Sequence, residues 1–192
     1  RNRLVSRELE IAKTIQRSLL PKSMPRLSGY GLAGFCESAH QVGGDFYDVI
    51  KINDDALLLI IADVMGKGIP AAMFAAILRS LLRAVPEWMS QPAALLARVN
   101  RLLFEELSGV DMFITAQLIY VDSRNRRITA ASAGHCPALL SVDAEGNVKS
   151  ISPEGLPLGI LPDTTFSNQT ESLPRNSRVL LYTHGLTEAR NS

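Results

Sequence analysis

Apolar and polar residues repeat along this chain with two different periods, which divide it into expected helices and strands. Near the start, Leu4, Ile11 and Ile15 form one apolar stripe at helical spacing, while most charged residues fall elsewhere. We therefore expect a helix from Arg3 to Leu20, ended by the prolines of the segment Pro21–Pro25. Such a helix either packs on its own domain or links the domain to a partner or to an upstream module.

The rest of the chain has the pattern of strands interrupted by two helices. The helices are expected from Ile69 to Ala84, with Pro70 in the first turn, and from Ser90, a candidate N-cap, to Leu107. Apolar segments bounded by turn residues, including a turn at 143–147, predict strands at 30–37, 45–52, 56–62, 113–122, 127–133, 138–142, 148–151 and 179–183. Strands, two consecutive helices and more strands predict an α+β domain with a mostly antiparallel sheet.

Composition narrows the class of protein further. A chain of 192 residues with 46% hydrophobic and 20% charged residues is typical of one globular domain. The net charge of +1 gives no global field, so we expect neither a nucleic acid nor a membrane partner. Cys36 and Cys136 are too few for a disulfide scaffold, and we expect a cytoplasmic protein. Because the sequence begins without Met and stops abruptly at Ser192, we expect a piece of a longer chain.

Two motifs fail for lack of structural context. Gly29 to Gly34 matches G-x-G-x-x-G, but it runs into an expected strand and not into a helix, so it is not a dinucleotide site. His135 and Cys136 are adjacent on a strand, so their side chains point to opposite faces. No G-x-S-x-G elbow surrounds Ser132, and these features argue against a serine or cysteine hydrolase.

Two carboxylates stand beside glycines at the ends of expected strands. Gly43 and Gly44 precede Asp45, which allows a sharp turn with little bulk around the carboxylate; Asp48, three residues on, faces the opposite side. Asp63 directly ends a buried strand, before a glycine-rich turn, and strand ends hold a side chain rigidly. Carboxylate, backbone carbonyl and water oxygens suit magnesium or manganese. The alternative for Asp45 and Asp48 is a glycine turn with solvated carboxylates. The alternative for Asp63 is a helix N-cap, but the next expected helix begins near Pro70, too far away for that role.

A third polar position has the same setting. His184 follows the expected strand ending at Thr183 and precedes Gly185. Alone, a histidine here is more often a surface or hydrogen-bonded residue than a ligand. Three polar positions at strand ends beside glycine favour one shared site.

These motifs, together with others in order along nearly the whole chain, resemble the SpoIIE/RsbU-like branch of the PPM metal-dependent protein serine/threonine phosphatases. The segments that carry the resemblance are Glu8 to Pro21, Val42 to Asp48, Ala62 to Gly68, Ala131 to His135, Gly155 to Gly159 and Leu181 to Asn191. The resemblance implies an α+β fold, a two-layered antiparallel β-sandwich flanked by helical pairs. It also implies a linker or switch helix at 1–25 and a PPM-type phosphatase domain, C-terminally truncated, at 26–192.

The resemblance further implies two manganese or magnesium ions. Asp63 would bridge them, and Asp45 and the carbonyl of Val64 would complete one ion site. Such a pair lowers the pKa of a bridging water, which attacks phosphorus in line. This chain has His184 where the family usually has an aspartate for the other ion, and the family's last metal-binding aspartate falls beyond Ser192. One ion site is therefore expected to be intact and the other weakened or lost.

The function implied is dephosphorylation of phosphoserine or phosphothreonine on a regulatory protein, of the STAS-type anti-sigma-factor-antagonist class, in bacterial signalling. An upstream sensor domain would act through the N-terminal helix. The resemblance also allows a homodimer. The alternative, favoured by His184, is a catalytically impaired pseudophosphatase that still binds a phosphoprotein or partner. A purely structural oligomerisation module would leave Asp45 and Asp63 without a role.

Overall fold

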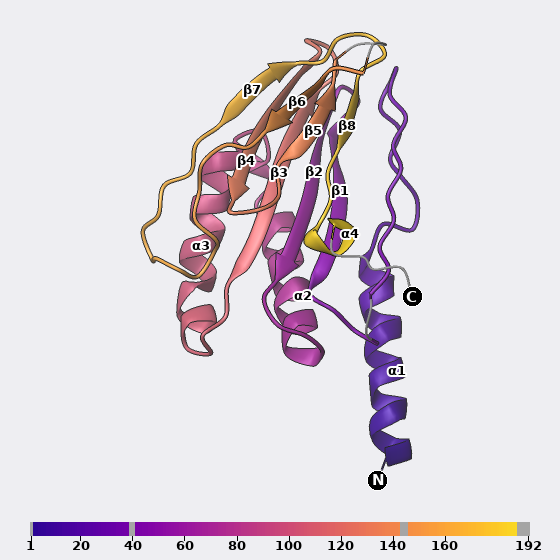
Figure 1. The fold of residues 1–192 in the computed structure, drawn as a ribbon, viewed down its shortest axis with the longest axis vertical. Coiled ribbons are helices and arrows are strands. Elements are labelled where there is room, and N and C mark those ends of the chain that lie inside the picture. Colours follow the sequence, from indigo (N-terminus) through magenta and orange to yellow (C-terminus); the bar gives the residue numbers. More distant parts are fainter. Residues whose placement is uncertain (1, 39–40, 143–145, 188–192) are drawn as a thin grey trace.

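The computed structural model describes residues 2–38, 41–142 and 146–187, and the fold is built from two antiparallel sheets preceded by a long helix (Figure 1). The turn expected at 143–147 lies partly outside the described residues. So does the last part of the motif that runs to Asn191.

The larger sheet has five strands in the order β1-β2-β3-β4-β7, and the smaller has three in the order β6-β5-β8. All neighbouring strands are antiparallel. The strands are β1 (Asp45–Asn53), β2 (Ala56–Val64), β3 (Ile114–Asp122), β4 (Arg127–Ala133), β5 (Ala138–Ser141), β6 (Val148–Ile151), β7 (Gln169–Ser172) and β8 (Arg178–Leu180). The two sheets face each other, which confirms the expected two-layered sandwich.

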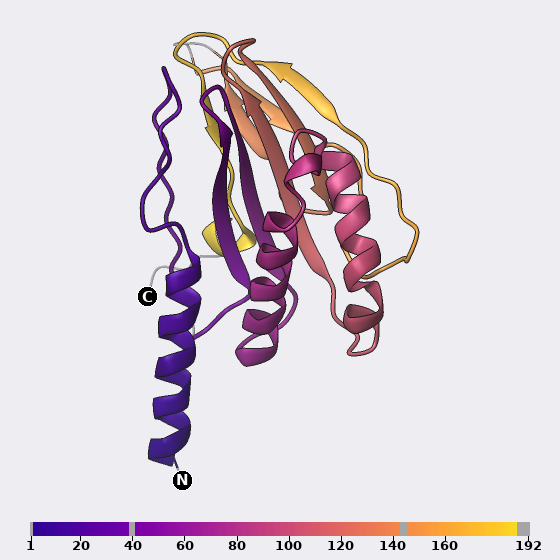
Figure 2. The same ribbon diagram turned by 180° about the vertical axis from the view of Figure 1, so that it is seen from behind.

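Two helices cover the outer face of the larger sheet. Figure 2 shows α2 (Ile69–Arg83) and α3 (Pro92–Ser108) side by side on that face, joined through the 3-10 turn η1 (Pro86–Trp88). Pro70 lies in the first turn of α2, as expected. The N-cap expected at Ser90 is wrong, because α3 begins after Gln91 and has no side-chain cap.

The larger sheet is buried on both faces, so the fold has two hydrophobic cores. Leu58 of β2 packs with Leu78 and Leu96 of the helices, whereas its neighbour Leu57 packs with Ile128 and other residues between the sheets. Each such buried side chain contributes about 1.5–3 kcal/mol relative to leaving it in water. Burial on both faces explains why β2 is apolar almost throughout and lacks the alternation of a half-exposed strand.

The strand expected at 30–37 is wrong, and one strand of the structure was not expected. Residues 31–38 form a loop, and only an isolated bridge from Leu27 to Tyr30 precedes it. Strand β7 lies at the edge of the sheet and has the polar sequence Gln-Thr-Glu-Ser. It has no apolar residues from which a strand could be predicted. The last strand also ends at Leu180 and not at Thr183, and a short helix, α4 (His184–Thr187), follows.

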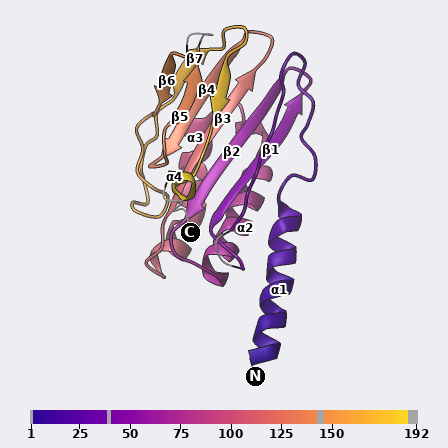
Figure 3. The ribbon, with the colours of Figure 1, turned by 45° about the vertical axis from the view of Figure 1, so that its right-hand side comes forward.

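The first helix, α1 (Asn2–Leu19), projects away from the sheets (Figure 3). The predicted stripe of Leu4, Ile11 and Ile15 is 69%, 53% and 57% exposed, so it does not pack on this domain. Near its C-terminal end, Gln16 and Leu19 lie against α2 and β1. Over the described part of the chain, none of the helices combines the length and apolar character needed to cross a bilayer.

Candidate metal-binding site

Asp45 and Asp63 lie directly opposite each other on neighbouring strands. Asp45 is the first residue of β1, and the antiparallel register pairs it with Asp63 near the end of β2. Residues opposed in this way project to the same face of a sheet, with Cβ atoms about 4.5–5.5 Å apart. Both side chains are partly exposed, and both line one cavity of about 580 Å³. The structure therefore brings the two predicted carboxylates together.

The glycine before Asp45 permits a close approach of the two strands. A Cβ built on Gly44 would lie 2.4 Å from the carbonyl oxygen of Val64. At this close approach the N–H of Val64 donates to the carbonyl oxygen of Gly44 at 3.2 Å. The backbone of Val64, a residue expected to offer its carbonyl to an ion, is thus fixed beside the strand that carries Asp45.

The segment around His184 also reaches this site, although another residue makes the contact. The hydroxyl of Thr183 donates to Oδ2 of Asp45 at 2.8 Å, and a Cβ on Gly185 would lie 3.5 Å from the same oxygen. His184 itself is exposed at the start of α4. No group of three His, Cys, Asp or Glu side chains that could hold a metal ion occurs within the described residues. Thr183 was missed, since a hydroxyl at a strand end has no specific sequence signature.

The lining of the cavity fits a cation bound through oxygen. Its described charged residues are the carboxylates Glu37, Asp45 and Asp63 and one ammonium group, Lys67. An excess of carboxylates beside a backbone turn suits a hard divalent cation such as magnesium or manganese. Lys67 lies between Gly66 and Gly68, whose positive φ values of 96° and 73° make the tight turn after Asp63. The donor set thus fits the ion that the resemblance implies.

Cys36 lies in the same cavity and donates its thiol to the backbone oxygen of Asp45 at 3.7 Å. Burial, with a smaller contribution from the charge of Asp45, raises the pKa of this thiol. A raised pKa keeps the sulfur protonated and poorly nucleophilic. The environment of Cys36 therefore agrees with the argument against a cysteine hydrolase.

His135 is buried between the segment that contacts Asp45 and the strand that pairs with Asp63. Its Nε2 lies 2.9 Å from the carbonyl oxygen of Tyr182, and its Nδ1 lies 3.0 Å from the hydroxyl of Thr115. Burial is the main cause that lowers the pKa of this imidazole. The ring is therefore neutral at physiological pH.

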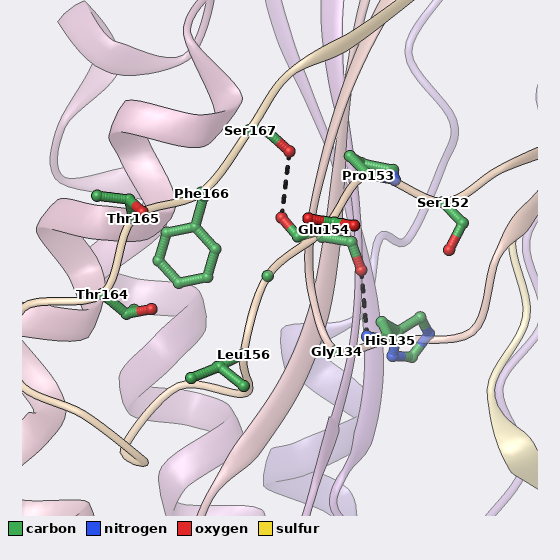
Figure 4. Close-up of a pocket in the computed structure, with 12 residues that line it drawn as sticks. Gly134, His135, Ser152, Pro153, Glu154, Leu156, Thr164, Thr165, Phe166 and Ser167 are labelled. Atoms are coloured by element: carbon green, nitrogen blue, oxygen red, sulfur yellow. Dashed lines mark hydrogen bonds between the residues drawn. The ribbon is translucent and has the colours of Figure 1, made fainter.

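A second cavity, of about 630 Å³, lies on another side of His135 (Figure 4). Its wall includes Glu154, Phe166 and Ser167, and the hydroxyl of Ser167 donates to the backbone oxygen of Glu154 at 3.2 Å. None of the predicted metal ligands lines this cavity. It is therefore separate from the candidate site.

Asp48 points away from the cavity, as its spacing from Asp45 predicts. It is 1% exposed, so the alternative of a solvated carboxylate at this position is wrong. Arg83 on α2 donates to both of its oxygens, at 2.6 and 2.7 Å, and Arg79 Nε lies 3.4 Å away. The hydrogen bond with Asp48 is also the main cause that raises the pKa of Arg83. This ion pair fastens α2 to the strand that begins with Asp45.

Comparisons with known proteins agree with this architecture. A sequence model of the family "Stage II sporulation protein E (SpoIIE)" matches residues 53–192. The phosphoserine phosphatase RsbU of Bacillus subtilis is 30% identical over 97% of this chain and 55% of its own length. The phosphoserine phosphatase RsbP of the same organism is 28% identical over 95% of this chain and 45% of its own.

Among solved structures, the SiaA-PP2C domain of Pseudomonas aeruginosa superimposes with a TM-score of 0.73 at 21% identity. The match covers 93% of this chain and 71% of that one, and it supports the fold. The chain spans about half the length of the two Bacillus phosphatases. With the family match covering well over half of the chain, this protein belongs to the SpoIIE family and has the RsbU-like PPM-type phosphatase domain.

Proposed function

We propose that this domain hydrolyses phosphoserine or phosphothreonine on a regulatory protein, with a divalent metal ion held by Asp45 and Asp63. The observation that carries the proposal is the pairing of these two carboxylates across β1 and β2 at the wall of one cavity. The names of RsbU and RsbP as phosphoserine phosphatases support the same reaction.

Each residue of the site has a distinct part in this proposal. Asp45, Asp63 and the carbonyl of Val64 would hold the ion, which when bound lowers the pKa of a water and offsets phosphoryl charge. Thr183 donates to Oδ2 of Asp45, which fixes the rotation of that carboxylate. Lys67, the cation among the described cavity residues, is suited to contact the phosphoryl oxygens.

The number of ions is part of the proposal. Asp45, Asp63 and Val64 provide oxygen donors for one manganese or magnesium ion. A second ion would depend on His184, a neutral nitrogen ligand where an anionic oxygen is usual in the family, so we propose that this second site binds more weakly.

The partners, the location and the division of the chain are also part of the proposal. We propose a phosphorylated STAS-type antagonist as the substrate, a cytoplasmic location, and a division into a linker helix at 1–25 and the phosphatase domain at 26–192. An upstream sensor would act through α1, whose exposed residues Leu4, Ile11 and Ile15 offer an apolar face for a second copy or for that sensor.

A second candidate is a pseudophosphatase that binds a phosphoprotein without turnover. The observation that favours it is the exposed position of His184, together with the lack of three suitable ligand side chains in one group among the described residues. In this case the cavity would still accept a phosphorylated side chain beside Lys67.

Manganese-dependent phosphatase activity of the full-length protein separates the two. Wild type, Asp63→Asn and His184→Asp are compared, with Asp54→Asn, an exposed carboxylate far from the cavity, as the control. The enzyme proposal expects activity in wild type and control, loss of roughly 100-fold or more in Asp63→Asn, and a lower manganese requirement in His184→Asp. Activity that appears only in His184→Asp would establish the pseudophosphatase instead. Full activity in Asp63→Asn would overturn the metal site.

A further inference from the structure

We propose that His135 is a positioning residue that holds the Asp45 side and the Asp63 side of the site in fixed relation. The proposal rests on the proposed function for its catalytic meaning, but its structural content can be tested without turnover. It is carried by hydrogen bonds from both nitrogens of a buried ring to two segments, one leading to Asp45 and the other to Asp63.

The directions of these bonds follow from their chemistry. The carbonyl oxygen of Tyr182 can only accept, so Nε2 of His135, at 2.9 Å, carries the proton. In the neutral ring Nδ1 is then the acceptor, and the hydroxyl of Thr115 donates to it at 3.0 Å. The imidazole thus presents one donor and one acceptor to two different segments of the chain.

One of these segments leads to Asp63. Thr115 is the residue opposite Asp63 in the register of β2 and β3, and its Oγ1 also lies 3.4 Å from the backbone oxygen of Asp63. A hydroxyl has one proton to donate, and the shorter contact to Nδ1 takes it. His135 is therefore joined through a single residue to the strand that presents Asp63.

The other segment leads to Asp45. Tyr182 is followed directly by Thr183, whose hydroxyl donates to Oδ2 of Asp45 at 2.8 Å. Strand β8 ends at Leu180, so residues 181–183 lie beyond the sheet ladder that would otherwise fix their backbone. The bond from His135 holds this segment at the point where the ladder has ended.

The ring is itself rigidly held. His135 is 6% exposed, and its backbone N–H donates to the hydroxyl of Ser132 at 3.1 Å. The preceding Gly134 has a φ of 65°, and a Cβ there would lie 2.9 Å from Pro157. Any buried histidine needs partners for its ring nitrogens, and here those partners lie on the two segments that lead to Asp45 and to Asp63.

The test compares His135→Leu with His135→Gln, whose side-chain amide retains a donor for the Tyr182 carbonyl. Ser167→Ala is the control, because it removes an exposed hydroxyl from the neighbouring cavity and leaves every contact of His135 in place. Hydrogen–deuterium exchange of residues 181–185 and calorimetric titration with Mn²⁺ are measured on the full chain.

We expect faster exchange at 181–185 and Mn²⁺ affinity about 10-fold weaker in His135→Leu, since outer hydrogen-bond partners commonly have effects of this size. His135→Gln should recover most of both losses, and Ser167→Ala should match wild type. Wild-type exchange and affinity in His135→Leu would overturn the proposal.

If His135→Leu does not fold, Thr115→Val decides the matter. It removes the donor to Nδ1 and should weaken Mn²⁺ binding in the same direction; unchanged binding would overturn the proposal. Failure of the proposed function has a different signature, namely a wild type that neither binds Mn²⁺ nor releases phosphate. The exchange measurement reports on the positioning role even then.

Discussion

Gln16 of α1 makes two hydrogen bonds to the backbone of Gly43, two residues before Asp45. Its Oε1 accepts from the Gly43 N–H at 3.1 Å, and its Nε2 donates to the Gly43 carbonyl oxygen at 2.5 Å. One side chain thus joins the helix that projects from the domain to the turn that presents a predicted metal ligand. Motion of α1 along its axis would be transmitted to that turn.

We predict that Gln16→Ala releases the turn. Each lost bond contributes about 0.5–1.5 kcal/mol, so hydrogen exchange at residues 41–46 should accelerate, and manganese-dependent activity should change with it. Arg17→Ala, an exposed neighbour on the same helix, is the control and should leave both unchanged. Equal exchange in the two variants would show that Gln16 does not couple the helix to the site.

Gly44→Ala should damage the site through the backbone. Its Cβ would lie 2.4 Å from the Val64 carbonyl oxygen, so β1 and β2 must separate where Asp45 and Asp63 pair. We expect a loss of about 1–3 kcal/mol of unfolding free energy and weaker Mn²⁺ binding, measured by urea unfolding and calorimetry. Gly31→Ala has no heavy atom within 4 Å of its Cβ and should behave as wild type. Two variants of equal stability and affinity would contradict the close approach.

Asp48→Asn should be strongly destabilising. The substitution leaves Arg79 and Arg83 without their anion, and breaking a buried ion pair costs about 3–5 kcal/mol. We expect the low end of that range, because the Arg83 side chain is 40% exposed and keeps some hydration. Urea unfolding measures the effect. Asp54→Asn, whose carboxylate is 96% exposed in its pair with Lys51, should shift stability by less than about 1 kcal/mol.

Stability should fall as the pH is lowered below about 6.5. Burial lowers the pKa of His135 from its ordinary 6.5, with a further decrease from His184 and opposing contributions from the Tyr182 hydrogen bond and Asp45. Between the folded and unfolded pKa values the unfolded chain binds more protons. The contribution of the neutral ring is therefore complete above pH 6.5 and lost as the pH falls toward the folded pKa.

Thermal unfolding of wild type and His135→Gln between pH 7.5 and 5 checks the sign of this effect (on the order of 1.4 kcal/mol for each unit of pKa difference). Wild type should lose more stability than the variant over this interval. Parallel curves would show that His135 titrates normally.

The sequence predicted the parts of the fold where periodicity is strong. Strand β2 and helices α2 and α3 were found nearly to the residue, because long apolar runs and prolines define them. Strand β7 was missed because an edge strand can be polar on both faces. The strand predicted at 30–37 is wrong because its apolar residues, such as Leu32 and the exposed Phe35, lie in a loop.

The candidate site was predictable only in part for a similar reason. Asp45 and Asp63 stand beside glycines at strand ends, which is a local signal. The contacts of Thr183 with Asp45 and of His135 with Thr115 join positions far apart in sequence, and pattern cannot find them. Asp48 was placed on the correct face, but its burial beneath two arginines of α2 depends on helix packing.

The alternation of side chains along β1 also limits how this domain can change length. Asp45 and Tyr47 line the cavity, while Asp48 and Ile50 face the helix layer. Inserting or deleting one residue within the strand would exchange these two sets, moving a carboxylate from the cavity to the arginines of α2. Length variation among homologues should therefore fall in the loop before Gly43 and be excluded from β1 itself.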